Sequence, residues 1–346
     1  MRTLRLFSII ATTVLIGLLA APATAQKVGV SSLQFLKVMP TARATAMGEA
    51  YVATARGVDA AFWNPAGLSA ITSHEITSTY TLWLFDTKQA ALAYGLSLGN
   101  WGQFAVQFQM TDIGAIRETS TDLLGYDANG GYRDGFTGRT FTPSSWLVGL
   151  SYGRQLTDHF SVGVTAKYVT ESLWNGSSIT VANIYGTPET FQTSVGALLF
   201  DVGMAYETGY RTIRIGAAVQ NFGEQIRFAQ EDYPAPLMFR LGLAADMIGT
   251  DAIVAESAEN RLTIEGDILQ PNDYDQQLHF GVEYGFADAL FLRAGYKWNY
   301  DADGLTFGGG ARVTVAGTRL GVDYSFGSMG EYLTNVHRIT LGVNFQ

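Results

Sequence analysis

Apolar and polar residues alternate along much of the chain, in segments of about ten residues that are separated by turns. In the last segment, `VHRITLGVNF`, Ile339 and Leu341 fall on one face, while Arg338 and Thr340 fall on the other. The segment `LFLRAGYKWNY`, which begins at Leu290, repeats the pattern. Because successive side chains of a strand point to opposite faces, a period of two predicts β-strands throughout.

About fourteen such segments follow one another from His74 to the end of the chain. They lie near residues 74–85, 88–98, 102–114, 142–156, 159–173, 195–208, 211–228, 237–248, 260–270, 275–286, 290–300, 304–315, 318–327 and 334–345. Short turns alternate with longer polar links, as in outer-membrane barrels. The link at 249–260 departs from this alternation, because it falls on the short side yet runs about a dozen residues. The pattern predicts an all-β fold, a monomeric transmembrane antiparallel β-barrel of about 14 strands.

The composition bears on whether this β-protein is soluble or spans a membrane. Charged residues make up 15% of the chain, against roughly 25% in soluble domains, whereas aromatics reach 12% and glycines number 39. A soluble sandwich or propeller is the alternative, but its exposed face would carry more charge and its edges more lysine. Aromatic residues lie near segment ends, for example Tyr296 and Trp298, as in interfacial girdles. The composition therefore favours the membrane barrel.

The first 25 residues have the features of a secretory signal peptide. Arg2 and Arg5 precede an apolar run, and Ala23-Thr24-Ala25 matches a small-residue cleavage site. A membrane anchor is the alternative, but the run is shorter than the ~20 residues that a spanning helix needs. We therefore predict cleavage near Ala25 and location in the outer membrane of a Gram-negative-type bacterium. The expected division is residues 1–25 signal peptide, 26–72 N-terminal hatch and 73–346 barrel.

Residues 26–72 precede the first strand and differ from the rest of the chain. The stretch `TARATAMGEAYVATA` is rich in alanine and can form a short helix that begins at Pro40-Thr41. In `WNPAGL`, Pro65 disfavours helix at Asn64, and Gly67 allows a tight reversal. This predicts a compact plug inside or beneath the barrel. A capping segment outside the barrel is the alternative.

These residues also carry a family resemblance. `FLKVMPTARATAMGEAYVATARGVDAAFWNPAGL`, followed by `HEITSTYTLWLFD`, resembles the N-terminal signature of the PorV/PorQ outer-membrane proteins, which are related in fold to the FadL long-chain fatty-acid channels. The resemblance implies fourteen strands and an N-terminal hatch. The motif residues are Arg43, Met47, Gly48, Trp63, Asn64, Pro65 and Gly67.

The resemblance implies two functions. On the PorV side it implies a type IX secretion component that binds secreted cargo and hands it over, with a large translocon barrel and cargo proteins as partners. On the FadL side it implies a passive channel for hydrophobic solutes such as long-chain fatty acids. A purely structural barrel remains a third possibility.

Several charged residues fall on the face that should point into the barrel. A charge facing lipid at mid-bilayer would cost about 2–4 kcal/mol for Arg or Lys, so these side chains require water or partners inside. One hypothesis is that they hold the hatch through the carbonyls of `NPAG` or through Glu49 and Asp59, and the other is ordinary pairing across strands. The residues are Arg293, Arg312, Arg319, Asp323 and Arg338, with Lys297 nearby.

Catalytic, metal and nucleic-acid signatures are missing from the sequence. The four histidines fall on separate segments, and the chain has no cysteine, so no zinc pattern exists. No nucleophile-elbow sequence is present, although a Ser-His-Asp site assembled from different strands is not excluded by sequence. The formal net charge of −9 argues against nucleic acid. We therefore expect no enzyme activity, no cofactor and no metal.

Overall fold

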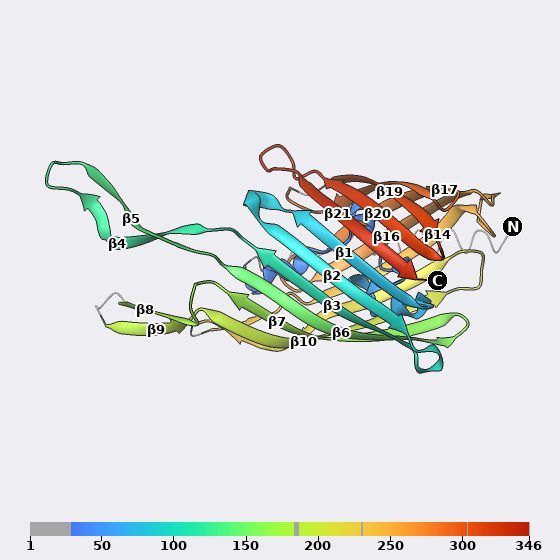
Figure 1. The fold of residues 1–346 in the computed structure, drawn as a ribbon, viewed down its shortest axis with the longest axis horizontal. Helices are drawn as coiled ribbons and strands as arrows, with labels where there is room; N and C mark the ends of the chain where they lie inside the picture. The colour runs from blue at the N-terminus through green and yellow to red at the C-terminus, as the bar shows by residue number, and fades with distance from the viewer. Residues whose placement is uncertain (1–28, 183–186, 230, 303, 346) are drawn as a thin grey trace, which may run out of the picture.

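The computed structural model describes residues 29–182, 187–229, 231–302 and 304–345. Fourteen antiparallel strands pair in order around a closed barrel, as the alternation predicts (Figure 1). Pairing of β1 with β21, from His74 opposite Phe345 to Leu82 opposite His337, joins the first strand to the last. The barrel strands are β1 (His74–Leu82), β2 (Lys88–Ser97), β3 (Gln103–Asp112), β6 (Ser144–Thr157), β7 (Phe160–Ser172), β10 (Ser194–Glu207), β11 (Arg214–Gly223), β14 (Met238–Gly249), β16 (Asn260–Pro271), β17 (Gln277–Phe286), β18 (Leu290–Trp298), β19 (Leu305–Val315), β20 (Thr318–Gly327) and β21 (Val336–Phe345).

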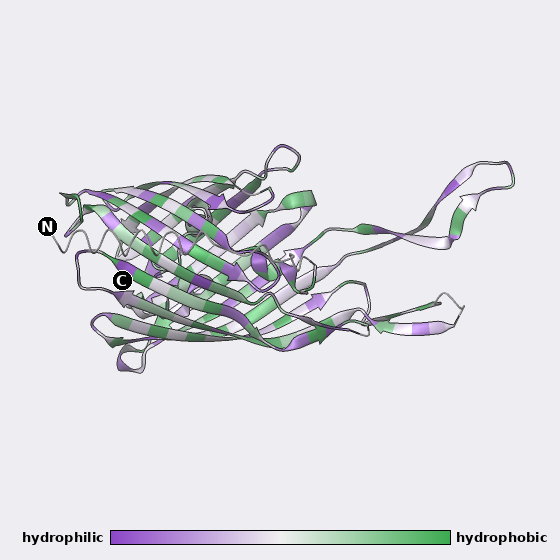
Figure 2. Cartoon of the chain, turned by 180° about the vertical axis from the view of Figure 1, so that it is seen from behind, coloured by the Kyte–Doolittle hydropathy of each residue, from purple (hydrophilic) through white to green (hydrophobic). Residues whose placement is uncertain are grey.

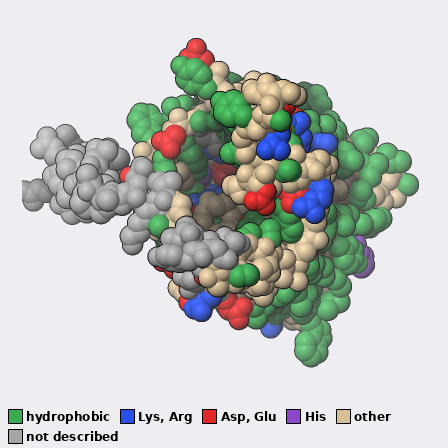
Figure 3. Space-filling view, turned by 90° about the vertical axis from the view of Figure 1, so that its left-hand side faces the viewer, with side chains coloured by type: hydrophobic (Ala, Val, Ile, Leu, Met, Phe, Trp, Pro, Cys, Tyr) green, Lys and Arg blue, Asp and Glu red, His purple; other side chains and the backbone are tan. Residues whose placement is uncertain are grey.

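The two faces of each strand have the predicted characters. On β18, Arg293 and Lys297 are buried, whereas Leu292 and Trp298 are 68% and 64% exposed on the outer face. Hydrophobic and hydrophilic positions alternate along the strands in Figure 2. Figure 3 looks onto one end and shows a central hollow with charged side chains, next to an outer wall covered by hydrophobic side chains. An apolar outer surface and a polar interior are what a bilayer requires of a barrel.

The longest links extend from one end of the barrel, and most links at the other end are short turns. The hairpins β4–β5 (Ile116–Tyr126, Tyr132–Phe141) and β8–β9 (Ser178–Ala182, Pro188–Gln192) extend from one end (Figure 1). A smaller hairpin, β12–β13 (Gln225–Arg227, Asp232–Pro234), lies in the link between β11 and β14. The exceptional link at 249–260 contains β15 (Ala255–Glu256), which pairs in parallel with the end of β14. That link is therefore long because it adds a short strand.

Residues 29–73, called the N-terminal segment below, contain four short helical elements. They are η1 (Gln34–Lys37), α2 (Ala42–Ala46), α3 (Ala60–Trp63) and η2 (Pro65–Ala70). Two further 3₁₀ turns, η3 (Leu84–Asp86) and η4 (Gly99–Trp101), lie in strand links. Within the described ranges, no helix is long and apolar enough to cross a bilayer. The predicted signal peptide lies outside the described residues.

The predicted helix after Pro40-Thr41 is shorter than its alanine content suggests. Thr41 is the N-cap of α2, but the helix ends at Ala46. Gly48 and Glu49 then take left-handed conformations with φ of 65° and 63°. A left-handed conformation ends a helix and is unfavourable for a residue other than glycine, so tertiary contacts must hold Glu49 in place.

Candidate functional site

The N-terminal segment is the most deeply buried part of the described chain. Trp63, Tyr51, Met47 and Leu68 are fully buried, and Tyr51 and Trp63 pack edge to face with ring centroids 5.7 Å apart. The element η2 contacts β6, β7 and β10, whereas α2 contacts β18 to β21. The segment therefore touches strands on both halves of the barrel.

The motif `WNPAGL` is fixed by the side chain of Asn64. Its Nδ2 donates to the carbonyl oxygens of Val52 at 2.9 Å and of Met204 on β10 at 3.0 Å. Its Oδ1 accepts from the backbone N–H of Ala66 at 3.2 Å, so Asn64 also caps η2. Pro65 occupies the first position of η2, where a missing N–H costs nothing. One side chain thus ties the turn to the segment, to the barrel and to the next helix.

Glycines in the wall allow the segment's backbone to approach the strands. A Cβ at Gly203 on β10 would lie 2.1 Å from Oδ1 of Asn64, and one at Gly163 on β7 would lie 2.2 Å from the carbonyl carbon of Pro65. On the other half of the barrel, Gly281 and Gly295 pair across β17 and β18. The backbone of Met47 and Gly48 lies against this pair, and no side chain would fit there.

Gly67 follows Asn64 in a tight turn, in which its N–H donates to the carbonyl oxygen of Asn64 at 3.0 Å. It lies within η2, and a Cβ there would be 2.0 Å from the carbonyl oxygen of Ala55. Its own carbonyl accepts from the N–H of Gly57 at 3.2 Å. Close contact between two parts of the segment requires glycine here.

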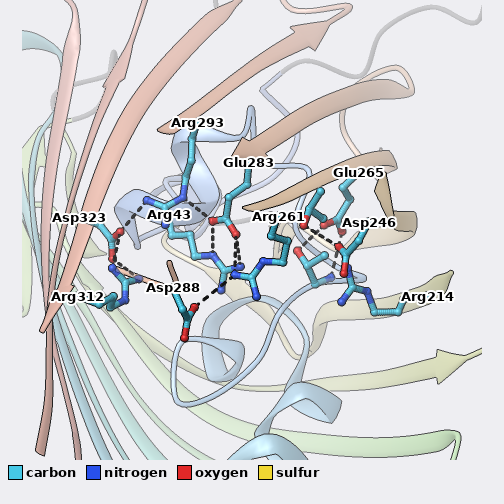
Figure 4. A network of polar contacts seen from close by, with 12 residues as sticks. Arg43, Arg214, Asp246, Arg261, Glu265, Glu283, Asp288, Arg293, Arg312 and Asp323 are labelled. Atoms are coloured by element: carbon cyan, nitrogen blue, oxygen red, sulfur yellow. Dashed lines mark hydrogen bonds and ion pairs between the residues drawn. The ribbon is translucent and has the colours of Figure 1, made fainter. Parts of the chain in front are cut away.

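Arg43 joins the N-terminal segment to an ionic network on the wall (Figure 4). Its guanidinium binds the carboxylate of Glu283 on β17 through two hydrogen bonds of 2.9 Å. Arg293 also binds Glu283, at 2.6 Å, and continues to Asp323 at 2.7 Å. Arg312 then binds the other oxygen of Asp323 at 2.9 Å. Three of the predicted inward charges thus belong to one network, which reaches the segment through Glu283.

A second ionic contact links Glu49 to the wall. Its carboxylate lies 2.5 Å from Nζ of Lys297 on β18 and 3.7 Å from a guanidinium nitrogen of Arg240 on β14. Burial raises the pKa of a carboxyl, but at Glu49 the charges of Lys297 and Arg240 outweigh it and lower the pKa to about 2. The guanidinium carbon of Arg240 also lies 5.1 Å from the ring centroid of Trp63.

Arg319 and Arg338, the remaining predicted positions, lie beside other residues of the barrel. Arg319 binds Asp288, in the turn after β17, at 2.6 Å. Arg338 is buried with its guanidinium 5.2 Å from the ring centroid of Trp83. The carbonyls of Phe62 and Trp63, just before `NPAG`, instead accept from Nε2 of Gln220 on β11 at 2.9 and 3.2 Å.

Two carboxylates on β16 that we did not single out from the sequence hold the backbone of residues 51–54. Asp267 accepts from the N–H groups of Tyr51 and Val52 at 2.8 and 3.0 Å. Glu265 accepts from the N–H of Ala53 at 2.7 Å and also bonds Thr54. Both lie on the inward face of β16. The alternation in `RLTIEGDIL` could therefore have identified them as inward-facing charges.

The N-terminal segment lies between two cavities. One, of about 590 Å³, lies at the end with the long links and is lined largely by apolar side chains, including Phe35, Trp83 and Leu269, with Arg240 and Lys297 among its polar groups. The other, of about 420 Å³, lies at the end with the short turns and is lined mainly by charged and polar residues. Both cavities touch the segment, through Glu49 and Arg43 respectively.

Comparison with protein families gives one match. The family model described as "Type IX secretion system protein PorV" matches residues 21–266, which is more than half of the chain. Comparison with curated proteins finds no match.

Solved structures with a similar fold include two toluene transporters and a FadL homologue. The toluene transporter TodX of Pseudomonas putida has a TM-score of 0.56 and 15% identity, covering 87% of this chain and 96% of its own. The toluene transporter TbuX of Ralstonia pickettii has a TM-score of 0.53 and 14% identity, covering 88% and 98%. A FadL homologue of Pseudomonas aeruginosa has a TM-score of 0.50 and 12% identity, covering 88% and 98%. At these identities the likeness shows the barrel fold alone.

Proposed function

The chain belongs to the PorV family of type IX secretion system proteins and is an outer-membrane β-barrel component of such a system. From this premise we propose that it works without enzymatic chemistry, by receiving secreted cargo from a large translocon barrel and passing it toward the cell surface. The family match over residues 21–266 is the observation that carries the proposal. We further propose that cargo is recognised through the links at the long-hairpin end.

We also propose that residues 26–72 act as a hatch that closes the barrel. Support comes from contacts on opposite walls: Asn64 bonds β10, Arg43 bonds β17 and Glu49 bonds β18. The separation of the two cavities by this segment supports the same proposal. A closed lumen suits a protein that binds cargo at its outer surface, because transport through its own pore is then unnecessary.

The hairpins at one end support a role in partner binding. β4–β5 extends far beyond the barrel strands (Figure 1), and Tyr126 and Tyr132 near its turn are 73% and 66% exposed. Lipid does not account for exposed aromatics that lie beyond the barrel wall, whereas tyrosines are common in protein interfaces. Asn175 bonds the backbone of Thr140 and Thr142, which fixes the second hairpin's base against the first.

One observation favours the second function, a passive channel for hydrophobic solutes. The 590 Å³ cavity has the size and the mainly apolar lining of a small-molecule site. In that case the N-terminal segment would have to rearrange to let the solute leave the cavity. We rank this function second because the family match is to a secretion protein.

One experiment distinguishes the secretion role from the channel. The tagged protein is purified from native outer membranes in mild detergent, and its protein partners and bound lipids are identified by mass spectrometry. The secretion role is supported by recovery of a very large barrel subunit or of cargo proteins that share a C-terminal domain. Recovery of the chain alone, with a stoichiometric fatty acid or other hydrophobe, would refute it and favour the channel.

A further inference from the structure

The cavity at the short-turn end is unusually rich in arginine. Its lining includes seven arginines, namely Arg43, Arg56, Arg214, Arg261, Arg293, Arg312 and Arg319. Short turns mark the periplasmic end of an outer-membrane barrel, so this cavity faces the periplasm. The N-terminal segment separates it from the outer cavity, and a ligand would therefore reach it from the periplasm.

Positive charge exceeds negative charge on one wall of this cavity (Figure 4). Five of the guanidiniums, those of Arg43, Arg261, Arg293, Arg312 and Arg319, share three carboxylates, those of Glu283, Asp288 and Asp323. Five positive charges minus three negative charges leave an excess of two. Arg214 and Arg56 are matched separately, by Asp246 and Glu207.

Arg261 has the longest distances to its carboxylate partners of the five arginines in this group. Its guanidinium is 3.8 Å from Glu283 and 3.9 Å from Asp288, which is too far for hydrogen bonds. Its side chain is 43% exposed. Among the described residues no hydrogen bond of its guanidinium is found, and the residue lines the cavity.

An aromatic ring holds the guanidiniums together. The guanidinium carbons of Arg261, Arg293 and Arg312 lie 6.0, 5.2 and 5.0 Å from the centroid of the Phe291 ring. Cation–π attraction to this shared ring offsets part of their mutual repulsion. The ring also gives the cavity an apolar surface beside the charges.

Two acidic groups on the other side of the cavity balance this excess in the cavity as a whole, so the excess is a property of one wall only. Asp59 of the N-terminal segment and Glu75 of β1 also line the cavity. Glu75 already accepts hydrogen bonds from the N–H of Val58 and from Nδ2 of Asn344. The cavity therefore has one cationic wall, on β16 to β20, and one acidic side.

We propose that Arg261, Arg312 and Arg319 form a binding site for a carboxylate-bearing ligand that enters from the periplasm. The forked guanidinium matches a carboxylate through two parallel hydrogen bonds. A volume of about 420 Å³ falls within the usual range for ligand sites and admits a small dicarboxylate or the acidic end of a peptide. The ligand would lie beside Glu283, the partner of Arg43, and so beside the anchor of the N-terminal segment. This site depends on the orientation of the barrel and not on the secretion role.

Fluorescence anisotropy of the purified full-length protein tests the site. The probes are a fluorescein-labelled tetraglutamate peptide, the matching tetralysine peptide, and unlabelled glutarate and inorganic phosphate as competitors, all at low salt. Variants are Arg261→Gln and Arg319→Gln, singly and together. The matched control is Arg139→Gln, which removes an arginine that binds Glu118 on the β4–β5 hairpin, away from the cavity.

We expect tetraglutamate but not tetralysine to bind, with affinity that falls as salt rises. Each single variant should weaken binding by about tenfold or more, as for loss of a charge-assisted hydrogen bond, whereas the control stays within about twofold of wild type. Competition by glutarate would identify a small dicarboxylate as sufficient; failure of both glutarate and phosphate to compete would identify a peptide ligand. The proposal is overturned if tetraglutamate does not bind, if phosphate displaces tetraglutamate and glutarate does not, or if Arg261→Gln and Arg139→Gln weaken binding equally.

Discussion

A Cβ atom at Gly295 on β18 would lie 2.1 Å from the backbone nitrogen of Gly48 in the N-terminal segment. Replacing Gly295 by alanine must therefore displace the segment or the strand, since backbone atoms cannot yield as a flexible side chain can. We expect Gly295→Ala to leave the barrel folded but to speed amide hydrogen exchange of residues 42–50. The control is Gly266→Ala on β16, where a new Cβ would meet nothing closer than 3.9 Å. Equal exchange in the two variants would contradict the close packing.

Asn64 supplies a second prediction. Asn64→Ala removes two hydrogen bonds to carbonyls, one in the segment and one on β10. Leaving these groups unpaired in a buried site should cost about 1–3 kcal/mol of local stability. Hydrogen exchange of residues 60–70 measures this loss. Asn175→Ala, which also removes hydrogen bonds to the backbone but in an exposed link, should leave these residues unchanged.

Asp267 allows a comparison between two substitutions at one position. Asp267→Ala leaves the N–H groups of Tyr51 and Val52 without their acceptor, and should raise the exchange rate of residues 51–54. Asp267→Asn keeps one oxygen acceptor and removes a negative charge next to Glu265. It should therefore have the smaller effect. Equal effects of the two substitutions would show that charge, and not hydrogen bonding, holds this stretch, because both remove the negative charge.

The strands and the barrel were predictable because they depend on local alternation. The opposite burial of Arg338 and Ile339 follows from the period of two, without knowledge of the partner strand. The pairing of Glu49 with Lys297 is different, because 248 residues separate them. Their contact depends on where the N-terminal segment lies inside the barrel, and no local pattern encodes that position. The sequence therefore predicted that inward charges need partners, but not which partners they have.

Two positions in the segment show what a local sequence pattern cannot predict. Gly67 was interpreted as a turn residue. The contact that also requires glycine there is with Ala55, which lies twelve positions earlier in the chain, and the local pattern does not show it. One hypothesis assigned arginines to the `NPAG` carbonyls, and the donor to the carbonyls of Phe62 and Trp63 just before the motif is Gln220, a neutral amide on β11. We considered only charged inward residues and so overlooked it.

The Glu49–Lys297 pair makes stability depend on pH. The pKa of Glu49 is about 2 in the folded protein, below its ordinary value of 4.5. A lowered carboxyl pKa stabilises the folded state above the ordinary pKa, and this contribution is lost as pH falls from about 4.5 toward 2. We expect the stability difference between wild type and Glu49→Gln to be constant above pH 5 and to shrink below it. Denaturant unfolding at each pH measures the difference, and a constant difference down to pH 2 would argue against the pair.

Deletion of the gene in the native bacterium, followed by quantitative proteomics of the cell surface and periplasm, tests the secretion role most directly. Proteins with the C-terminal secretion signal should disappear from the surface and accumulate in the periplasm, and the intact gene should restore them. Uptake of long-chain fatty acids should be unchanged. Normal surface delivery of these proteins together with loss of fatty-acid uptake would contradict the secretion role and establish the channel instead.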